Sequence, residues 1–248
     1  YYAKGLEYLL KNNNEISALK TIKKNYKLII KRDYITKEVK RIIDEFRPEI
    51  IISDFEPATI NYGRKNKIKT VSFDNEHYIT EGKYTIPKHN YIDYLKTKII
   101  VKRFKADEYI IFTLPGQELC DRSRAKSVLP IIKESLKNAK PSKEKHILVY
   151  TSITKNRKII EILKKVGEKF IIYGFNENRN DDNLIFRKYS DKGFDNDLIN
   201  SKAAITTGGI NLISEAIYLE KPLLVIPIKH QFEQILNASY VKENNYGE

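Results

Sequence analysis

The stretch TTGGINLISEAIYLEKPLLVIPIKHQFEQILNA, Thr206–Ala238, decides the fold. An apolar run ends at its threonines, and a helical pattern begins directly after Gly208 and Gly209. A second apolar run then ends at Pro227, and a second helical pattern follows it. Strand, turn and helix in this order are typical of a parallel sheet flanked by helices.

The same alternation extends outward over most of the chain. We predict strands at residues 49–55, 68–73, 107–113, 146–152, 169–175, 183–189, 203–207 and 222–227. Between residues 115 and 145 the pattern weakens and prolines and glycine gather, which is typical of a domain boundary. We therefore predict an α/β fold of two Rossmann-like domains facing across a cleft, with residues 1–114 and 146–248 as the domains and residues 115–145 as the linker. Ligands of such sheets bind at the carboxyl ends of the strands.

The chain begins YYAKGLEYLL and contains no methionine among its 248 residues. It starts without an opening strand and stops directly after a helical pattern. We expect an internal stretch of a longer protein that lacks the first βα unit and the C-terminal end, so that both domains are incomplete.

Cysteine and histidine usage argues against a metal site. The single cysteine, Cys120, cannot form an intramolecular disulfide and fits a reducing compartment. The four histidines are scattered without metal-ligand spacing. We predict no metal and no resident cofactor.

The net charge of +13 suits a polyanionic partner, which includes nucleic acid, anionic lipid and phosphorylated substrates. A lysine-rich proteome would produce the same balance. No nucleic-acid-binding motif occurs and the lysines are spread along the chain, so we expect no nucleic-acid partner. No apolar run reaches the roughly 18–20 residues that span a bilayer. The basic stretch KTIKKNYKLIIKRDY, residues 20–34, fits either a solvated helix face or an anionic membrane surface.

The turn Thr207–Gly209 offers the first chemistry. Glycines let a ligand approach the backbone, and the free N–H groups of a helix start carry partial positive charge, which suits phosphate. A tight turn whose glycines serve packing alone is the alternative.

Acids and amides follow the turn at two places. Glu215 could accept hydrogen bonds from two adjacent hydroxyls, as on a ribose, or could be a solvated helix charge. Glu233, Gln234 and Asn237 could bind sugar hydroxyls or could be capping residues at a helix start. Only the ordered combination points to a nucleotide sugar.

That combination resembles the donor-binding signature of the two-domain GT-B glycosyltransferases of the UDP-sugar group. These include the peptidoglycan lipid-intermediate N-acetylglucosaminyltransferase and the plant secondary-product and glucuronosyl transferases. Their turn and helix are followed by Glu, then Pro, then Asp-Gln-x-x-Asn-Ala. Here the matching residues are Glu215, Pro227 and the run Glu233-Gln234-x-x-Asn237-Ala238. The resemblance is strongest over residues 203–246.

The resemblance implies a role for each matching residue. It implies diphosphate contacts from Thr207, Gly208, Gly209 and Asn211, a ribose contact from Glu215 and sugar contacts from Glu233 and Gln234. Tyr189 and Ser190 occupy the place where bacterial relatives hold the base. His230 falls near the donor, or is a surface histidine. Two departures stand out: Thr207 replaces a histidine of the plant enzymes, and Leu212 replaces a phosphate-binding serine.

The N-terminal half, RPEIIISDFEPATINYGRKNKIKTVSFDNEH, resembles the acceptor domain of the same enzymes. There a strand ends in an aspartate that orients a histidine base, and Asp54 matches the aspartate. The family's histidine lies on an N-terminal loop that has no counterpart here. His77 is a candidate base or acceptor contact, and otherwise a loop histidine. Glu56 is a further candidate acid.

The sequence therefore predicts an inverting, metal-independent glycosyltransferase that uses a UDP-sugar as co-substrate. The acceptor would be a hydroxyl compound, such as a membrane lipid or a glycan, and the enzyme would work in the cytoplasm, at the inner face of the membrane. UDP-sugar hydrolases and 2-epimerases share the fold and the nucleotide site, and they remain the alternative class because a fold does not fix a reaction. A basic nucleic-acid-binding protein is a remote alternative.

Overall fold

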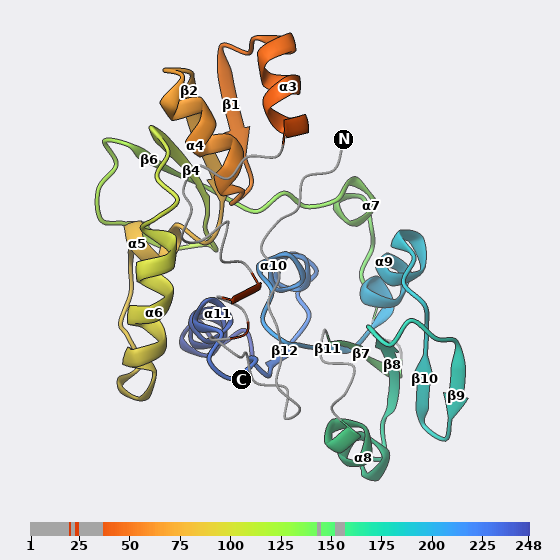
Figure 1. Ribbon diagram of the computed structural model, residues 1–248. Coiled ribbons are helices and arrows are strands. Elements are labelled where there is room, and N and C mark those ends of the chain that lie inside the picture. Colours follow the sequence, from red (N-terminus) through yellow and green to blue (C-terminus); the bar gives the residue numbers. More distant parts are fainter. Residues whose placement is uncertain (1–19, 21–22, 25–36, 143–144, 152–156) are drawn as a thin grey trace. The chain divides into compact units, whose positions relative to one another are not determined.

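The computed structural model describes residues 20, 23–24, 37–142, 145–151 and 157–248. The chain folds into two compact units and passes from the first to the second between Leu129 and Pro130 (Figure 1). Most of the basic stretch 20–34 lies outside the described residues.

The described part of the first unit is built on a parallel sheet of four strands in the order β1-β2-β4-β6. Two short strands, β3 and β5, form a separate antiparallel pair. The strands are β1 (Ile50–Ser53), β2 (Lys69–Asp74), β3 (Gly82–Lys83), β4 (Glu108–Phe112), β5 (Glu118–Leu119) and β6 (Ala125–Val128). The helices are α3 (Lys37–Phe46), α4 (Pro57–Lys65), α5 (Tyr78–Glu81), the 3-10 turn η1 (Lys88–Asn90) and α6 (Tyr91–Val101).

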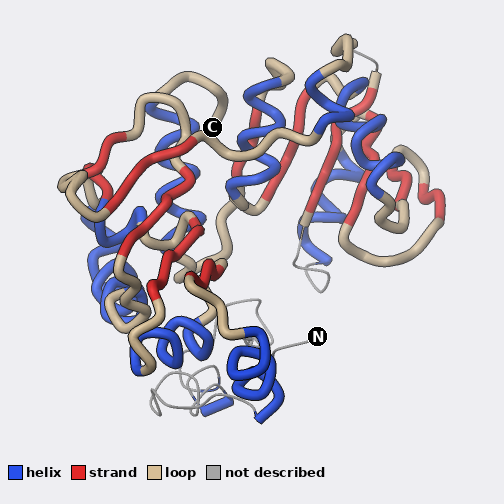
Figure 2. The backbone as a smooth tube through the Cα atoms, turned by 90° about the horizontal axis from the view of Figure 1, so that it is seen from above, coloured by secondary structure: helices blue, strands red, loops and turns tan. Residues whose placement is uncertain are grey.

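The second unit carries a six-stranded sheet in the order β12-β11-β7-β8-β10-β9, which is parallel except for β9. Its strands are β7 (His146–Tyr150), β8 (Lys169–Tyr173), β9 (Arg179–Asp181), β10 (Leu184–Phe186), β11 (Ala203–Thr206) and β12 (Leu223–Val225). Its helices are α7 (Glu134–Lys137), α8 (Arg157–Lys165), α9 (Asp191–Asn200), α10 (Ile210–Tyr218) and α11 (Phe232–Glu243). Helices flank the strands of this sheet (Figure 2).

The order of the parallel strands in the second unit is that of a Rossmann fold. Along the sheet they follow the chain order 3-2-1-4-5 from β10 to β12, so the order reverses between β7 and β11. At such a switch point the loops after the two neighbouring strands lead to opposite faces and leave a crevice. The turn Thr207–Gly209 directly follows β11 and lies at this point.

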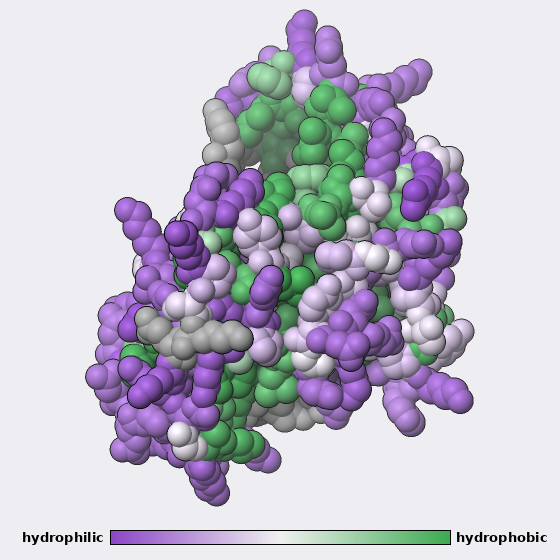
Figure 3. Space-filling model, turned by 180° about the vertical axis from the view of Figure 1, so that it is seen from behind, coloured by the Kyte–Doolittle hydropathy of each residue, from purple (hydrophilic) through white to green (hydrophobic). Residues whose placement is uncertain are grey.

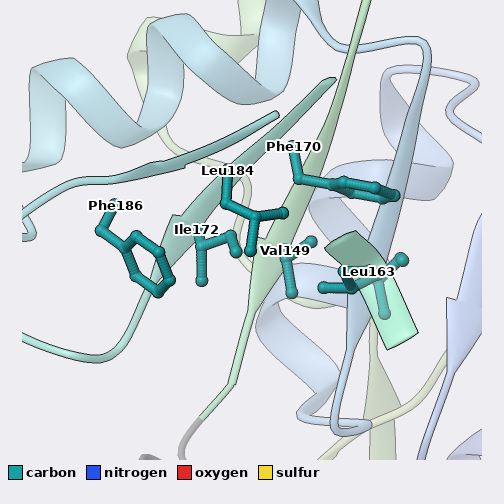
Figure 4. Packing of buried hydrophobic residues seen from close by; sticks show 7 residues of the cluster. Val149, Leu163, Phe170, Ile172, Leu184 and Phe186 are labelled. Carbon is teal, nitrogen blue, oxygen red and sulfur yellow. The ribbon is translucent and has the colours of Figure 1, made fainter. Parts of the chain in front are cut away.

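The core of the second unit explains why continuous apolar runs become strands. β8 is buried at all but its first residue, because it lies between β7 and β10 with helices packed on the sheet. One cluster joins β7, β8, β10 and α8 through Val149, Leu163, Phe170, Ile172, Leu184 and Phe186 (Figure 4).

The first unit keeps apolar residues on its surface. β1 is an edge strand of the described sheet, and its alternation exposes Ile50 and Ile52 while Ile51 is buried. Phe46, at the end of α3, is also exposed, although its spacing from Val39 and Ile43 predicts a shared buried face. Hydrophobic surface is visible at the top of Figure 3, over this part of the first unit.

The predicted linker 115–145 contains regular structure. β6 pairs with β4 in the sheet of the first unit, and α7 belongs to the second. Their short, polar sequences carry no clear period, because Lys126 and Ser127 of β6 are exposed and α7 spans a single turn. Within the described ranges, none of the helices is long and apolar enough to cross a membrane.

Candidate functional site

Gly208 holds the turn after β11 in a conformation that other residues rarely adopt. Its φ is +102°, and an added Cβ would lie 3.1 Å from both Cβ and the carbonyl oxygen of Gln234. Its N–H donates to Thr206 Oγ1 at 3.3 Å. Backbone conformation and close packing both require glycine here. Thr207, beside it, is buried.

Gly209 is glycine for a different reason. It is the N-cap of α10 with ordinary backbone angles, and a Cβ added to it would meet nothing within 4 Å. As a glycine, Gly209 has no side chain to cap this helix start, and Asn211 in the first turn is exposed. Space therefore remains at Gly209, at the start of α10 and the switch point of the sheet. The first N–H groups of a helix have no partner within the helix and can donate hydrogen bonds to an anion.

The second half of the signature ties the turns after β11 and β12 together. Asn237 Nδ2 donates to Gly208 O at 2.9 Å, and Gln234 Oε1 accepts from Ile228 N at 2.9 Å. Gln231 caps α11 by accepting from Gln234 N at 2.6 Å and donates to Glu233 Oε2 at 3.0 Å. The N-cap of α11 is therefore Gln231, which is none of the three residues of the capping alternative, and Glu233 and Gln234 are half-buried.

Glu215 is only 5% exposed and belongs to a buried charge cluster. Lys133 Nζ lies 3.6 Å from Glu215 Oε1 and donates to Asp195 Oδ1 at 2.8 Å. Ser135 Oγ donates to the other oxygen of Asp195 at 2.6 Å. One ammonium group thus neutralises two buried carboxylates that come from different helices.

Burial raises the pKa of the Glu215 carboxyl; the charge of Lys133 opposes this rise and that of Asp195 reinforces it. Burial would lower the pKa of Lys133, but the hydrogen bond to Asp195 and the charges of Glu215 and Asp195 outweigh burial and raise it. Lys133 therefore stays charged, and the ionised form of Glu215 depends on it.

Sequence reasoning missed Lys133, Ser135 and Asp195. Lys133 and Ser135 lie in the proline-rich stretch that predicts a linker, and Asp195 looks like any acid on a helix. No local pattern marks these residues, because only the fold brings them to Glu215.

Tyr189 and Ser190 directly precede α9. Ser190 is its N-cap and accepts from Gly193 N at 3.3 Å. Tyr189 is half exposed, donates to Asp191 Oδ1 at 2.9 Å and packs its ring 5.4 Å from that of Phe194. Burial and the hydrogen bond to Asp191 raise the pKa of Tyr189, and the nearby charge of Lys133 only partly opposes this rise. Lys133 therefore lies close to both Tyr189 and Glu215.

In the first unit, Asp54 follows β1, and Asp74 is the last residue of the neighbouring strand β2. Asp54 is exposed after β1, and partial burial together with the charge of Asp74 raises its pKa. Asp74, the last residue of β2, is buried and accepts from Ser72 Oγ at 2.5 Å and from His77 N at 2.9 Å. Asp54 is the carboxylate of this group that solvent reaches.

The geometry corrects the predicted role of His77. The residue is 2% exposed, its Nδ1 lies 2.8 Å from Asp74 Oδ2, and its Nε2 donates to Phe104 O at 2.8 Å. A carbonyl can only accept, so Nε2 carries a proton, and neither ring nitrogen is open to a substrate. His77 pairs with Asp74 instead of Asp54, and it fastens the end of β2 to the segment before β4.

Glu56 is also structural. It is the N-cap of α4, and its carboxylate accepts from Ala58 N at 2.8 Å, Thr59 N at 2.9 Å and Thr59 Oγ1 at 2.7 Å. Both oxygens are occupied, which argues against a role as a catalytic acid. His230 is exposed before α11 with a φ of +68°. No group of three or more His, Cys, Asp or Glu side chains in the described ranges is arranged to hold a metal ion.

Comparison with solved structures shows that the fold is shared with glycosyltransferases. A UDP-glucosyltransferase from Polygonum tinctorium matches with a TM-score of 0.59 at 15% identity, over 85% of this chain and 65% of that one. The spinosyn rhamnosyltransferase SpnG gives 0.58 at 13% identity, over 91% of this chain and 65% of that one. CalG4, the calicheamicin glycosyltransferase, gives 0.57 at 15% identity, over 94% and 68%.

These matches confirm the predicted α/β fold of the GT-B type, and the chain spans 65% of the length of the first two proteins. A search of curated protein sequences found no match. The family model described as Glycosyl transferase family 1 matches residues 3–248, nearly the whole chain. The chain belongs to glycosyl transferase family 1.

Proposed function

We propose that this protein transfers a sugar from a nucleotide sugar to a hydroxyl acceptor. The observation that carries the proposal is the start of α10, where Gly209 has no capping side chain and leaves free space at the switch point of a Rossmann sheet. Family membership supports the activity, and the geometry supports the place where the donor binds.

The donor in this proposal is a UDP-sugar. Its diphosphate lies against the turn Gly208–Gly209 and accepts hydrogen bonds from the first N–H groups of α10, with further contacts from Asn211 and Thr207. Glu215, whose carboxylate lies beside the ammonium group of Lys133, accepts from the two ribose hydroxyls. The base lies against the exposed ring of Tyr189, beside Ser190. Glu233 and Gln234 bind sugar hydroxyls, the latter through its amide NH₂, because its Oε1 already holds Ile228 N.

Transfer proceeds with inversion. The acceptor oxygen attacks the anomeric carbon as the bond from that carbon to the diphosphate oxygen breaks, and Asp54 takes the hydroxyl proton. A raised pKa suits a carboxylate to this task, since it makes Asp54 a stronger base than an ordinary aspartate. The N–H groups of α10 stabilise the negative charge that grows on the leaving UDP, so the step needs no metal ion. A lipid or glycan hydroxyl is the acceptor class that we expect.

Thermal-shift titration of the whole chain with UDP, GDP and dTDP tests the donor assignment. We expect UDP to stabilise the protein at micromolar concentrations and the effect to disappear in Glu215→Ala. One neighbour, SpnG, was solved with thymidine diphosphate, so dTDP is an informative competitor. Equal stabilisation of the wild type and Glu215→Ala by UDP would show that Glu215 is not the ribose contact.

UDP-sugar hydrolysis or 2-epimerisation is the second candidate, because the same donor site serves both. Incubation with a UDP-sugar and no acceptor separates these reactions from transfer. A transferase leaves the donor largely intact under these conditions, whereas fast release of free sugar or of an epimer would favour the second candidate.

A further inference from the structure

Helix α6 of the first unit has an apolar face that the fold leaves exposed. On its inner side Asp93, Tyr94 and Val101 are buried. On the outer side Ile92, Leu95 and Ile99 are 67%, 42% and 58% exposed. Their spacing places the three side chains in one stripe along the helix.

Positive charge surrounds this stripe. Residues 88–105 contain the cations Lys88, Lys96, Lys98, Lys102, Arg103 and Lys105, and their one acid, Asp93, lies on the buried side. The helical rotation of 100° per residue puts Lys96 on one flank of the stripe and Lys102 on the other. Tyr91, 53% exposed, also lies beside it. The outer face therefore combines an apolar centre with a cationic rim.

We propose that this face of α6 docks on a membrane surface that contains anionic lipids. A helix lying in the plane of the interface buries its apolar stripe at the boundary between headgroups and acyl chains, while its lysines meet lipid phosphates. Tyrosine is favoured at the same depth, which suits Tyr91. A second copy of this chain fits less well, because two cationic rims would face each other across the interface.

The inference does not depend on the proposed sugar transfer, since docking is measured without donor or acceptor. It concerns residues 91–102, which differ from the basic stretch 20–34. If the acceptor is a membrane lipid, docking through α6 would keep the first unit at the membrane surface that contains the acceptor.

Vesicle flotation of the whole chain tests the docking face. We expect binding to phosphatidylcholine vesicles that contain phosphatidylglycerol, weak binding to phosphatidylcholine alone, and release by salt. The triple variant Ile92→Ser/Leu95→Ser/Ile99→Ser should bind at least about 10-fold more weakly, because the apolar contribution is lost. The double variant Lys96→Gln/Lys102→Gln should lose about 10-fold on anionic vesicles only.

Ile162→Ser is the matched control. Ile162 is a 61% exposed isoleucine on α8 of the second unit, with lysines and Glu161 around it, and its replacement should leave vesicle binding unchanged. Melting temperatures check that all variants fold, which is expected because every altered side chain faces solvent. The proposal fails if the wild type does not bind anionic vesicles, if the triple variant binds as well as the wild type, or if Ile162→Ser loses as much. Size-exclusion light scattering showing a dimer that the triple variant dissolves, with vesicle binding intact, would assign the face to self-association instead.

Discussion

Gly208 and Gly209 are neighbours in the sequence, yet each is glycine for a different physical reason. Gly208 has a positive φ and packs against Gln234, so any side chain strains the turn. Gly209 has ordinary backbone angles and faces open space, so only a bound ligand would meet its side chain. Substituting each in turn separates folding from binding.

We predict that Gly208→Ala lowers the free energy of unfolding by about 1–3 kcal/mol, because alanine must adopt the left-handed region against Gln234. Gly209→Ala should keep or slightly raise stability, since its backbone angles suit alanine. It should nevertheless weaken UDP binding, because the added methyl group crowds the diphosphate. Chemical denaturation and calorimetric titration measure the two effects. Unchanged UDP affinity in Gly209→Ala would move the diphosphate away from α10.

The raised pKa of Glu215 predicts how the folding stability depends on pH. In the folded state the carboxyl binds its proton more tightly than in the unfolded chain, so its contribution to stability is present at low pH and is lost as the pH rises through the folded pKa. Glu215→Gln mimics the protonated form and avoids this loss. The melting temperature of Glu215→Gln relative to the wild type should therefore rise as the pH increases from about 4 to 7. The same variant should bind UDP more weakly. A pH-independent difference in melting temperature would contradict the assignment.

Lys133 makes a separate prediction, because Asp195 and Glu215 share its ammonium group. Lys133→Met should destabilise the protein and weaken UDP binding, while Lys133→Arg retains most of both. Removing one member of a buried ion pair costs about 3–5 kcal/mol, and the partial exposure of Lys133 makes that an upper bound here. The cost of Lys133→Met should be smaller in the Glu215→Gln background, and a double-mutant cycle measures the difference. Additive effects would show that Lys133 and Glu215 do not interact.

At the scale of elements, the start of α4 separates two neighbouring acids. Glu56 caps the helix with both carboxylate oxygens, while Asp54 is exposed after β1. Glu56→Ala should cost about 1 kcal/mol of stability and leave turnover nearly unchanged. Asp54→Asn should keep the stability but lower kcat by about 100-fold or more, as expected for a general base. Urea denaturation measures the stability of each variant, and initial rates at saturating donor measure its kcat. The opposite pattern would assign the base to Glu56.

Two residues of the pattern that resembles the donor signature, Gln234 and Asn237, hold loops of the fold in place. Asn237 and Gln234 on α11 fasten the turns that follow β11 and β12. A pattern of residue types does not distinguish a side chain that binds a ligand from one that holds the loop a ligand needs. The structure makes the distinction, because it shows where each hydrogen bond goes.

At the scale of the whole molecule, the proposed mechanism relies on helix and backbone donors in place of a metal ion. We predict that transfer persists when a chelator removes divalent cations from the assay. A partial increase of the transfer rate by Mg²⁺ is compatible with this prediction, because Mg²⁺ screens the negative charge of the unbound donor. Complete loss of turnover with EDTA, restored by Mg²⁺ or Mn²⁺, would contradict the metal-independent step.

Much of the fold follows from the sequence alone. The apolar runs of the second unit became strands, with ends that differ by a few residues: the run 169–175 gives Lys169–Tyr173, and 203–207 gives Ala203–Thr206. Buried parallel strands are recognisable because both of their faces are apolar. The elements between residues 115 and 145 were missed, since β6 is largely polar and α7 is a single turn.

The sequence by itself determined the α/β class, the glycine turn at Thr207–Gly209 between a strand and a helix, and the family, because these depend on local period and on the order of residues along the chain. Only the tertiary structure decided the partners: that Lys133 serves Glu215, that His77 pairs with Asp74 and is closed to substrate, and that Glu56 caps a helix. Charges and hydrogen bonds act over a few ångströms of space, whatever their separation in sequence. A chain must therefore fold before its acids and bases acquire their roles.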